Sequence, residues 1–346
     1  MGELKSYYNY DQLWSRNGTF NFVTGARGLG KTYGAKLFCI RNALRNGDQF
    51  IYLRRYNTEL AGKSTFFADI EHEFPGFEFR VNGNVAEYTV EGRKDWQVMG
   101  YFAALSKSQS YKSRAYPLVK TIIFDEFIIE TGHIRYLKNE AKVFTDFYST
   151  VDRYKDKTRA LFLANALSIV NPYFAKYDIV PREDSEWATS GNGFIVAHFP
   201  RSDDFISEVE QTRFGQFIKR FDNDYSRYAV NSVFRDNTGD LVGDKPADAV
   251  YWFTILTDHG MYSVWRKSPM FYIQQKQPKH PIIMTTDPMS VTPDIHLMAT
   301  SDIVFVTIRN AYKYGQLIFD RPVSRASFVN SFRLWLGVCC CFGDGC

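Results

Sequence analysis

The sequence predicts an α/β fold with a parallel sheet in its N-terminal part and a smaller, strand-rich part after it. Strand-like and helix-like segments alternate up to about residue 200, which is the pattern of a parallel sheet with helical crossovers. A largely apolar run over residues 119–124 is typical of a strand buried on both faces of such a sheet. From residue 249 the pattern changes to paired strands, beginning with AVYWFTIL.

The length and composition indicate more than one domain. The 346 residues suffice for two, and 45% hydrophobic and 23% charged residues are ordinary for a globular protein. We expect a domain over residues 1–200, a helical and polar linker over 201–248, a strand-rich domain over 249–338 and a disordered, cysteine-rich tail over 339–346. No apolar run reaches about 18 residues and no signal peptide opens the chain, so we expect no membrane segment and a cytosolic protein.

The charge balance argues against a strongly basic nucleic-acid-binding domain. Lys and Arg number 42 against 38 Asp and Glu, a net charge of +4. Tight non-specific binding of nucleic acid by a monomer is therefore not expected, but a ring of subunits could still offer a few basic loops from each member. Of the five cysteines, only Cys39 lies outside the tail, which excludes a disulfide framework and fits a reducing compartment.

Periodicity and turn residues predict the individual elements. Apolar or β-branched runs predict strands over residues 21–24, 49–53, 119–124 and 160–164. Apolar residues at three- and four-residue spacings predict helices over 31–46, 58–73, 139–152, 203–220 and 324–336. Between residues 77 and 105, the turn pairs Asn82-Gly83 and Glu91-Gly92 predict hairpins. Residues 106–117 are expected to form a polar, basic loop.

A complete phosphate-binding motif lies between the first expected strand and helix. It consists of Gly25, Ala26, Arg27, Gly28, Leu29, Gly30, Lys31 and Thr32. Such glycines let backbone N–H groups point at phosphate oxygens, and the following helix adds its dipole. Lys31 is expected to reach the β- and γ-phosphates of ATP, and the Thr32 hydroxyl to ligate Mg²⁺. The alternative is a glycine-rich turn with a chance lysine.

Two acids follow the buried strand over residues 119–124. Because ligands bind at the carboxyl edge of open α/β sheets, Asp125 can hold the Mg²⁺ water shell opposite Thr32, and Glu126 can orient and activate the attacking water. Asn165 ends the strand over 160–164 and could sense the γ-phosphate. The alternatives are a solvated acidic turn for the two acids and a loop start for Asn165.

Such a site also needs positive charge near the γ-phosphate, because an arginine finger contributes a rate factor of about 10³ to 10⁵. The candidates are Arg27, Arg54, Arg55, Lys112, Arg114, Arg153, Lys155 and Arg159. Arg153 would end a helix that can project toward a neighbouring subunit. From spacing alone, a solvated helix end or loop remains the alternative for each of them.

Four strings resemble the DNA-packaging ATPases of phi29-like tailed phages, relatives of the large terminase subunits: GARGLGKT, QFIYLRRYNTELAG, AYPLVKTIIFDEF and LANALSIVNPYF. The resemblance covers about residues 7–220. It implies a homomeric ring, thought to be a pentamer, that drives double-stranded DNA into a preformed capsid and docks at the portal vertex through packaging RNA. It also implies an ASCE-type, RecA-like ATPase domain followed by a vestigial RNase H-like nuclease domain.

The resemblance also assigns expected roles to residues. Lys31, Thr32, Asp125 and Glu126 fall on the catalytic set, and Asn165 on the sensor position. Arg153 falls on a finger that acts on the neighbouring subunit, and Lys112 on a second basic position at the subunit interface. The position after the string RRY is basic in the family but is Asn57 here, which weakens any nucleotide-exchange role for that loop.

The acids after residue 249 argue against an active nuclease. Two-metal cleavage needs about three or four converging acids. Residues 249–338 contain no glutamate, and their aspartates are scattered: Asp258, Asp287, Asp294, Asp302 and Asp320. We therefore expect this domain to dock rather than cut.

The motifs predict an Mg²⁺-dependent ATPase. The resemblance implies that it works as a ring-forming motor for double-stranded DNA in the host cytoplasm, docked transiently at the procapsid portal vertex. One alternative within ATPases is a helicase or a partition-type motor, which would need single-strand stacking loops that we cannot identify. Others are a small-molecule phosphotransferase and a non-catalytic nucleotide-binding scaffold. No N-K-x-D string for guanine is present, so ATP is expected rather than GTP.

Overall fold

The computed structural model describes residues 8–129, 135–166, 171–179, 181, 185–201, 203–221, 241–257, 260–299, 301–313, 315–321, 324–325 and 328. The chain divides into two compact units. The first comprises Met1–Leu167 and Tyr177–Arg235, and the second Ser168–Lys176 and Asp236–Cys346. The expected tail, residues 222–240 of the expected linker and most of the helix expected over 324–336 lie outside the described residues.

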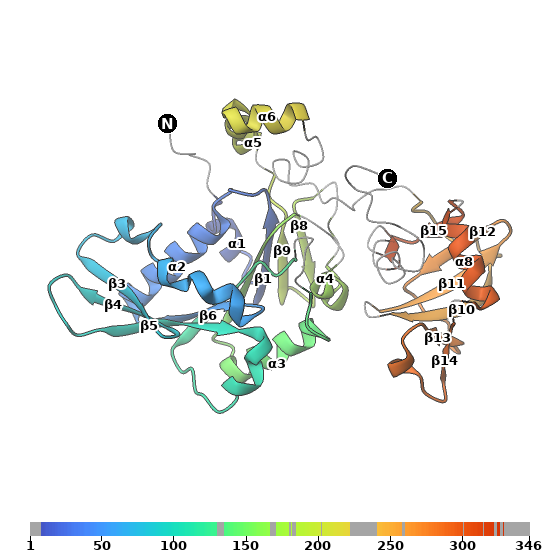
Figure 1. Cartoon of the computed structure of the whole chain (residues 1–346), viewed down its shortest axis with the longest axis horizontal. Helices are drawn as coiled ribbons and strands as arrows, with labels where there is room; N and C mark the ends of the chain where they lie inside the picture. The colour runs from blue at the N-terminus through green and yellow to red at the C-terminus, as the bar shows by residue number, and fades with distance from the viewer. Residues whose placement is uncertain are drawn as a thin grey trace. The chain divides into compact units, whose positions relative to one another are not determined.

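The first unit is built on a sheet of order β3-β4-β5-β2-β6-β7-β1-β9-β8 (Figure 1). Its strands are β1 (Phe20–Gly25), β2 (Gln49–Arg54), β3 (Phe77–Asn82), β4 (Val85–Val90), β5 (Gln97–Ala104), β6 (Val119–Asp125), β7 (Arg159–Asn165), β8 (Trp187–Ser190) and β9 (Ile195–His198). The six strands from β5 to β9 in this order are parallel, whereas β3, β4 and β8 add antiparallel edges. The predicted parallel α/β fold is confirmed.

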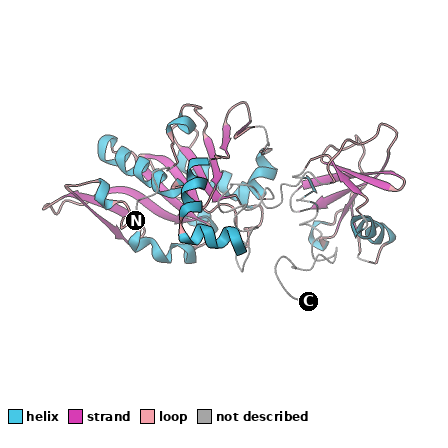
Figure 2. Ribbon diagram, turned by 90° about the horizontal axis from the view of Figure 1, so that it is seen from above, coloured by secondary structure: helices cyan, strands magenta, loops and turns pink. Residues whose placement is uncertain are grey.

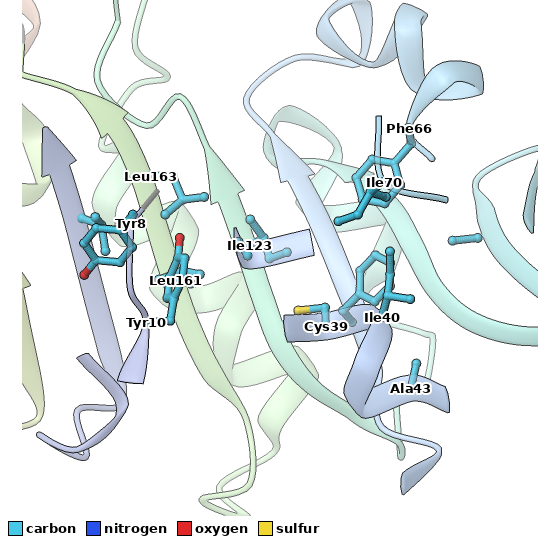
Figure 3. Close-up of a cluster of buried hydrophobic side chains, with 14 of the residues drawn as sticks. Tyr8, Tyr10, Cys39, Ile40, Ala43, Phe66, Ile70, Ile123, Leu161 and Leu163 are labelled. Atoms are coloured by element: carbon cyan, nitrogen blue, oxygen red, sulfur yellow. The ribbon is translucent and has the colours of Figure 1, made fainter. Parts of the chain in front are cut away.

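Helices cover both faces of this sheet. α2 (Lys31–Asn46) packs on one face, together with the 3₁₀ helices η1 (Asn57–Thr65) and η2 (Glu71–Glu73). Figure 3 shows Cys39 and Ile40 of α2 near Ile123 of β6 in this apolar cluster. Burial on both faces explains why β6 is largely apolar, with Lys120 only partly buried near its start.

The opposite face of the sheet is aromatic. The rings of Phe22 and Phe162 stack in parallel with centroids 4.0 Å apart. Phe144 from α3 (Glu140–Asp152) lies 4.5 Å from Phe162 and 5.8 Å from Phe124, measured between centroids. These phenylalanine rings therefore help to hold α3 against β1, β6 and β7.

Several local predictions need correction. The helix predicted over 203–220 is two helices, α5 (Asp203–Gln211) and α6 (Arg213–Phe221). The chain breaks there because the Thr212 hydroxyl accepts a hydrogen bond from the Gly215 N–H at 2.9 Å and so caps α6. The helix predicted over 58–73 is 3₁₀ in its regular parts, and the predicted loop at 106–117 begins with η3 (Leu105–Tyr111), also 3₁₀.

Four elements of the first part of the chain were not predicted at all. They are α1 (Asp11–Trp14), α4 (Pro172–Tyr177), β8 and β9. The last two are only four residues each, too short for a clear alternation. The turn Gly191-Asn192-Gly193 between them was the available signal: all three residues have positive φ.

The second unit has its own sheet, of order β14-β13-β10-β11-β12-β15. The strands are β10 (Val250–Thr257), β11 (Gly260–Lys267), β12 (Met270–Gln274), β13 (Ile283–Thr285), β14 (Ile295–Leu297) and β15 (Leu317–Phe319). The predicted strand pairs after residue 249 are thus confirmed as the antiparallel meander β10-β11-β12.

A separate apolar core supports this sheet. α8 (Ile303–Lys313) contributes Phe305, Ile308 and Ala311 to a cluster with Phe253 of β10 and Val264 of β11, and the short 3₁₀ turn η4 (Pro288–Ser290) lies between β13 and β14. Figure 2 distinguishes the helices from the strands of this mixed unit. Over the described residues, no helix has both the length and the apolar character that a membrane span requires.

Candidate active site

The phosphate-binding loop joins β1 to α2, as the sequence predicts. β1 ends at Gly25 and α2 begins at Lys31. Gly28 and Gly30 have φ values of 85° and 74°, a region that L side chains rarely adopt, which explains glycine at both positions. The first N–H groups of α2 have no partner within the helix, so the loop offers them and the helix dipole to an anion.

The Lys31 ammonium group folds back over this loop. Its Nζ donates to the carbonyl oxygens of Gly25 and Ala26 at 3.1 and 2.6 Å, and to Asn165 Oδ1 at 3.3 Å. Burial lowers the pKa of Lys31 to about 8, with Asp125 opposing the shift and Arg27 adding to it. Two predicted site residues that are 134 positions apart, Lys31 and Asn165, are therefore in contact.

Asp125 accepts hydrogen bonds from hydroxyl groups on two other elements. Thr32 Oγ1 lies 3.2 and 3.3 Å from its two carboxylate oxygens, so the predicted pair Thr32 and Asp125 is brought together. Tyr52 of β2, which the sequence analysis missed, donates its hydroxyl to Asp125 Oδ2 at 2.7 Å. Burial, and then Asp125, raise the pKa of Tyr52 well above its ordinary value, so the phenol stays a donor. Oxygen ligands of this kind suit Mg²⁺.

Glu126 lies at the mouth of the site in an uncommon backbone conformation. Its φ is 56°, in the left-handed region, and its side chain is 58% exposed. Arg54 Nη2 contacts Glu126 Oε2 at 2.5 Å and Glu59 Oε1 at 3.2 Å, while Arg54 Nη1 lies 4.0 Å from Asp125 Oδ2. Arg54 thus joins the three carboxylates, and Glu126 is the one that water reaches most easily.

A buried ion pair holds the backbone that carries Glu126. The side chains of Arg55 and Glu140 are 1% and 0% exposed, and Arg55 Nε lies 3.0 and 2.8 Å from the Glu140 carboxylate oxygens. Arg55 also donates to the carbonyl oxygens of Glu126 and Phe127 at 3.3 and 2.6 Å. Arg55 therefore serves the backbone, which corrects its place among the candidates for γ-phosphate charge. Glu140 was not predicted.

The N-terminal segment buttresses the loop from outside. The Tyr8 N–H donates to the Leu29 carbonyl at 2.8 Å, and the Tyr10 hydroxyl donates to the Lys31 carbonyl at 2.6 Å. Tyr8 also contacts Nδ1 of His198, at the end of β9, at 2.8 Å. Burial, followed by Arg16, lowers the pKa of His198 to about 4, so this imidazole is neutral near pH 7. No motif in the sequence indicates these supports.

Arg153 and Lys112 do not lie in this site. Arg153 follows the last residue of α3, and its Nη2 donates to the Arg114 carbonyl at 3.1 Å, two residues from Lys112. This contact is at the end of the sheet where β6 begins, since Lys157 Nζ reaches the Pro117 carbonyl at 2.5 Å and Thr158 Oγ1 reaches the Val119 carbonyl at 3.0 Å. β6 spans seven residues, about 20 Å at roughly 3.3 Å per residue, so Arg153 is remote from its own Glu126.

Comparison with known proteins now places this arrangement. The model of the podovirus DNA encapsidation protein (Gp16) family matches residues 3–334. The chain belongs to this family. The DNA packaging protein of Bacillus phage phi29 is 32% identical over 332 residues, which cover 94% of this chain and 97% of the relative. The DNA packaging protein of Bacillus phage B103 is 32% identical over 339 residues, covering 94% and 98%.

Solved structures of phi29 proteins agree with this membership. A chain of the phi29 viral genome packaging motor assembly is 31% identical, with a TM-score of 0.73, covering 96% of this chain and 100% of that one. The N-terminal domain of the phi29 DNA packaging ATPase is 39% identical with a TM-score of 0.52, covering 57% and 98%. This encapsidation protein therefore has the fold of a packaging ATPase, and the resemblance seen in its motifs is confirmed.

The buried lysine predicts that nucleotide binding by this encapsidation protein depends on pH. Above about pH 8 the free protein holds Lys31 neutral, so binding a phosphate must take up a proton. We expect the affinity for ATP to change little with the protonation of Lys31 below about pH 8 and to fall by up to about tenfold per pH unit above it.

Equilibrium binding of a fluorescent ATP analogue between about pH 7 and pH 10 measures this dependence. Lys31→Arg is the control, because its guanidinium stays charged throughout and should bind more weakly but with little pH dependence. A wild-type affinity that stays constant over this range would contradict the prediction.

Proposed function

We propose that this chain is the ATP-hydrolysing subunit of a homomeric ring, by resemblance a pentamer, that moves double-stranded DNA into a preformed capsid. One observation carries the proposal: Lys31, Thr32, Asp125, Glu126 and Asn165 converge at the carboxyl edge of β1, β6 and β7 in a member of the encapsidation family. Contacts across separate elements of this kind are not expected of a chance glycine-rich turn.

Each residue of the proposed site has a role that its contacts support. Lys31 exchanges the carbonyl oxygens of Gly25 and Ala26 for the β- and γ-phosphates of ATP. Thr32 and Asp125 would hold Mg²⁺, which would supply positive charge beside those phosphates. Asn165 lies against the Lys31 ammonium group and so is placed to register the γ-phosphate.

Glu126 orients and activates the attacking water. Its carboxylate is exposed, and in this state one of its oxygens pairs with Arg54, which leaves the second oxygen to take a proton from water. Arg55, which Glu140 holds by an ion pair, donates to the carbonyl oxygens of Glu126 and Phe127. The backbone of Glu126 therefore stays in place during the reaction.

Arg153 and Lys112 supply positive charge to a neighbouring subunit. Both are exposed at the end of the sheet opposite their own nucleotide site, and a ring brings such an end against the next subunit's site. The similar phi29 chain comes from a packaging motor assembly, which supports an oligomer. Docking at the portal vertex through packaging RNA, in the host cytoplasm, is carried over from the resemblance.

For the part after residue 249 we propose docking without cleavage, on a vestigial nuclease-like fold. Three of its described aspartates bind groups of their own fold. Asp287 accepts from the Met289 N–H and the Ser290 hydroxyl and Asp302 from the Ala299 N–H within local turns, and Asp320 accepts from the Gln275 N–H, 45 positions away. Within the described part of the chain, no three or more His, Cys, Asp or Glu side chains group as a metal site. The proposed division is 1–200 for the ATPase, 201–248 for the linker, 249–338 for docking and 339–346 for the tail.

Phosphate release by the purified full chain tests the proposal. With Mg²⁺ and ATP, hydrolysis should rise when double-stranded DNA is added and should fall to background in Lys31→Ala, which loses the main phosphate contact. DNA recovered from these reactions, and from parallel ones with Mn²⁺, should be uncut. Hydrolysis that persists in Lys31→Ala, or phosphate transferred to a small acceptor instead of water, would contradict the motor.

A further inference from the structure

The segment after α3 has an uncommon backbone. Arg153, Tyr154 and Asp156 all have positive φ values, of 53°, 56° and 50°. None is glycine, and non-glycine residues in this region are strained, most of all a bulky one such as tyrosine. Strain of this kind persists only where surrounding contacts impose it, and it concentrates at functional sites.

Asp152 is the residue that imposes this conformation. It is buried at the end of α3, and its carboxylate accepts four backbone N–H groups. Oδ2 accepts from Lys155 and Asp156 at 2.9 and 3.1 Å, and Oδ1 from Lys157 and Thr158 at 3.0 Å each. Although burial raises the pKa of Asp152, these bonds outweigh it and hold the pKa below its ordinary value. One carboxylate thus binds the backbone N–H groups of residues 155–158 and holds the turn after α3 in place.

The side chains that this turn displays face outward. Tyr154 is 91% exposed, and Arg153, Lys155 and Asp156 are exposed beside it. A large ring in water contributes nothing to the fold of its own subunit, yet the backbone is strained to present it. Tyrosine and arginine are the residue types that concentrate in the centres of protein interfaces.

We infer that Arg153 and Tyr154 form a preformed contact element that inserts against a second copy of this chain, with Asp152 as its positioning residue and Tyr154 as its anchor. The inference rests on the proposed trans-acting role of Arg153 and extends it to two residues to which the family resemblance assigns no role. A second copy is the partner because the element is remote from its own nucleotide site, and the Arg153 guanidinium complements nucleotide phosphates. Holding the turn rigid before contact lowers the ordering cost of placing a finger.

Asp152→Asn tests the positioning role. The amide keeps one acceptor oxygen and loses the other, so two of the four N–H groups lose their partner. In assembled protein with ATP and DNA, the maximal hydrolysis rate should fall by about tenfold or more, because a small misplacement of a catalytic group is costly. The dissociation constant for ATP and the slow rate of dilute, unassembled subunits should match wild type, which a general folding defect would not allow.

Asp156→Asn is the matched control, since it removes the same charge from the same turn without removing an acceptor of these N–H groups, and it should behave as wild type. Arg153→Ala is assayed alongside. If Arg153→Ala hydrolyses ATP slowly but Asp152→Asn hydrolyses it at the wild-type rate, the positioning role of Asp152 is wrong and the trans-acting role of Arg153 is retained. If Arg153→Ala also hydrolyses ATP at the wild-type rate, the trans-acting role of Arg153 is wrong.

Tyr154 gives a second test that carries no folding risk, because the side chain lies in water. Tyr154→Asn removes the ring but suits a positive φ, and Tyr154→Phe keeps the ring. Sedimentation of the full chain with DNA and a slowly hydrolysed ATP analogue measures assembly. We expect Tyr154→Asn to need about tenfold or more protein for half-assembly, with thermal stability unchanged, and Tyr154→Phe to assemble as wild type. Normal assembly of Tyr154→Asn overturns the anchor role.

Discussion

Glu126→Gln is expected to bind ATP as tightly as wild type and to hydrolyse it at least about a hundredfold more slowly. The amide keeps the shape of the side chain, but it cannot accept a proton from the attacking water. Because the Glu126 side chain is largely exposed and pairs with Arg54 through one oxygen, its replacement should not disturb the fold. Phosphate release at saturating ATP and binding of an ATP analogue separate the two effects.

Glu59→Gln is the matched control for this variant. Glu59 shares the Arg54 guanidinium, with Oε1 at 3.2 Å from Nη2, and its Oε2 accepts from the Tyr56 N–H at 2.6 Å. An amide oxygen can keep one of these contacts, and no water-activating role is proposed for the residue, so hydrolysis should stay within about threefold of wild type. If both variants were equally slow, the charge of the cluster rather than a base at Glu126 would be responsible. Near-normal hydrolysis by Glu126→Gln would show that Glu126 is not the base that activates water.

Arg153→Ala is expected to bind ATP normally and to hydrolyse it at least about a hundredfold more slowly when rings form, because transition-state charge is left without a partner. A neighbouring subunit with an intact Arg153 should restore part of the lost hydrolysis. In mixtures with Lys31→Ala, an intact Arg153 from the Lys31→Ala subunit can serve the intact site of the Arg153→Ala subunit. Part of the lost hydrolysis should therefore return, although neither variant is active alone.

The mixing series is measured at protein concentrations where rings are seen, because dilute subunits would be slow in every variant. Lys155→Ala is the control: it removes an exposed positive charge from the same turn and should leave most of the activity. If Arg153 acted within its own subunit, no mixing ratio would restore hydrolysis. If it were only a solvated helix end, Arg153→Ala would hydrolyse ATP at the wild-type rate.

Local sequence was a good guide where local chemistry decides the structure. The run from Gly25 to Thr32 needs glycine at its positive-φ positions, and the strand and helix around it were predicted to within about one residue. The apolar strand ending in Asp125 and Glu126 was equally clear, because burial on both faces leaves little choice of residue. The family resemblance followed from these same strings.

Contacts that depend on the order of strands in the sheet could not be predicted from the sequence. Tyr52 meets Asp125 because β2 lies beside β6, and Arg55 meets Glu140 because α3 begins at the edge where β2 ends. No residue spacing encodes either neighbour, since the partners are 73 and 85 positions apart. The same holds for His198, which reaches Tyr8 only because β9 pairs with β1.

The sequence by itself predicted a phosphate-binding loop and the two acids beside it, because a strained loop and a buried strand each demand particular residues at adjacent positions. Only the tertiary structure decided which arginine serves which purpose. Arg54 reaches Glu126, Arg55 is buried against Glu140, and Arg153 lies at the far end of α3. An arginine side chain suits all three environments, so its role is set by the long-range packing of strands and helices that brings its partner within reach.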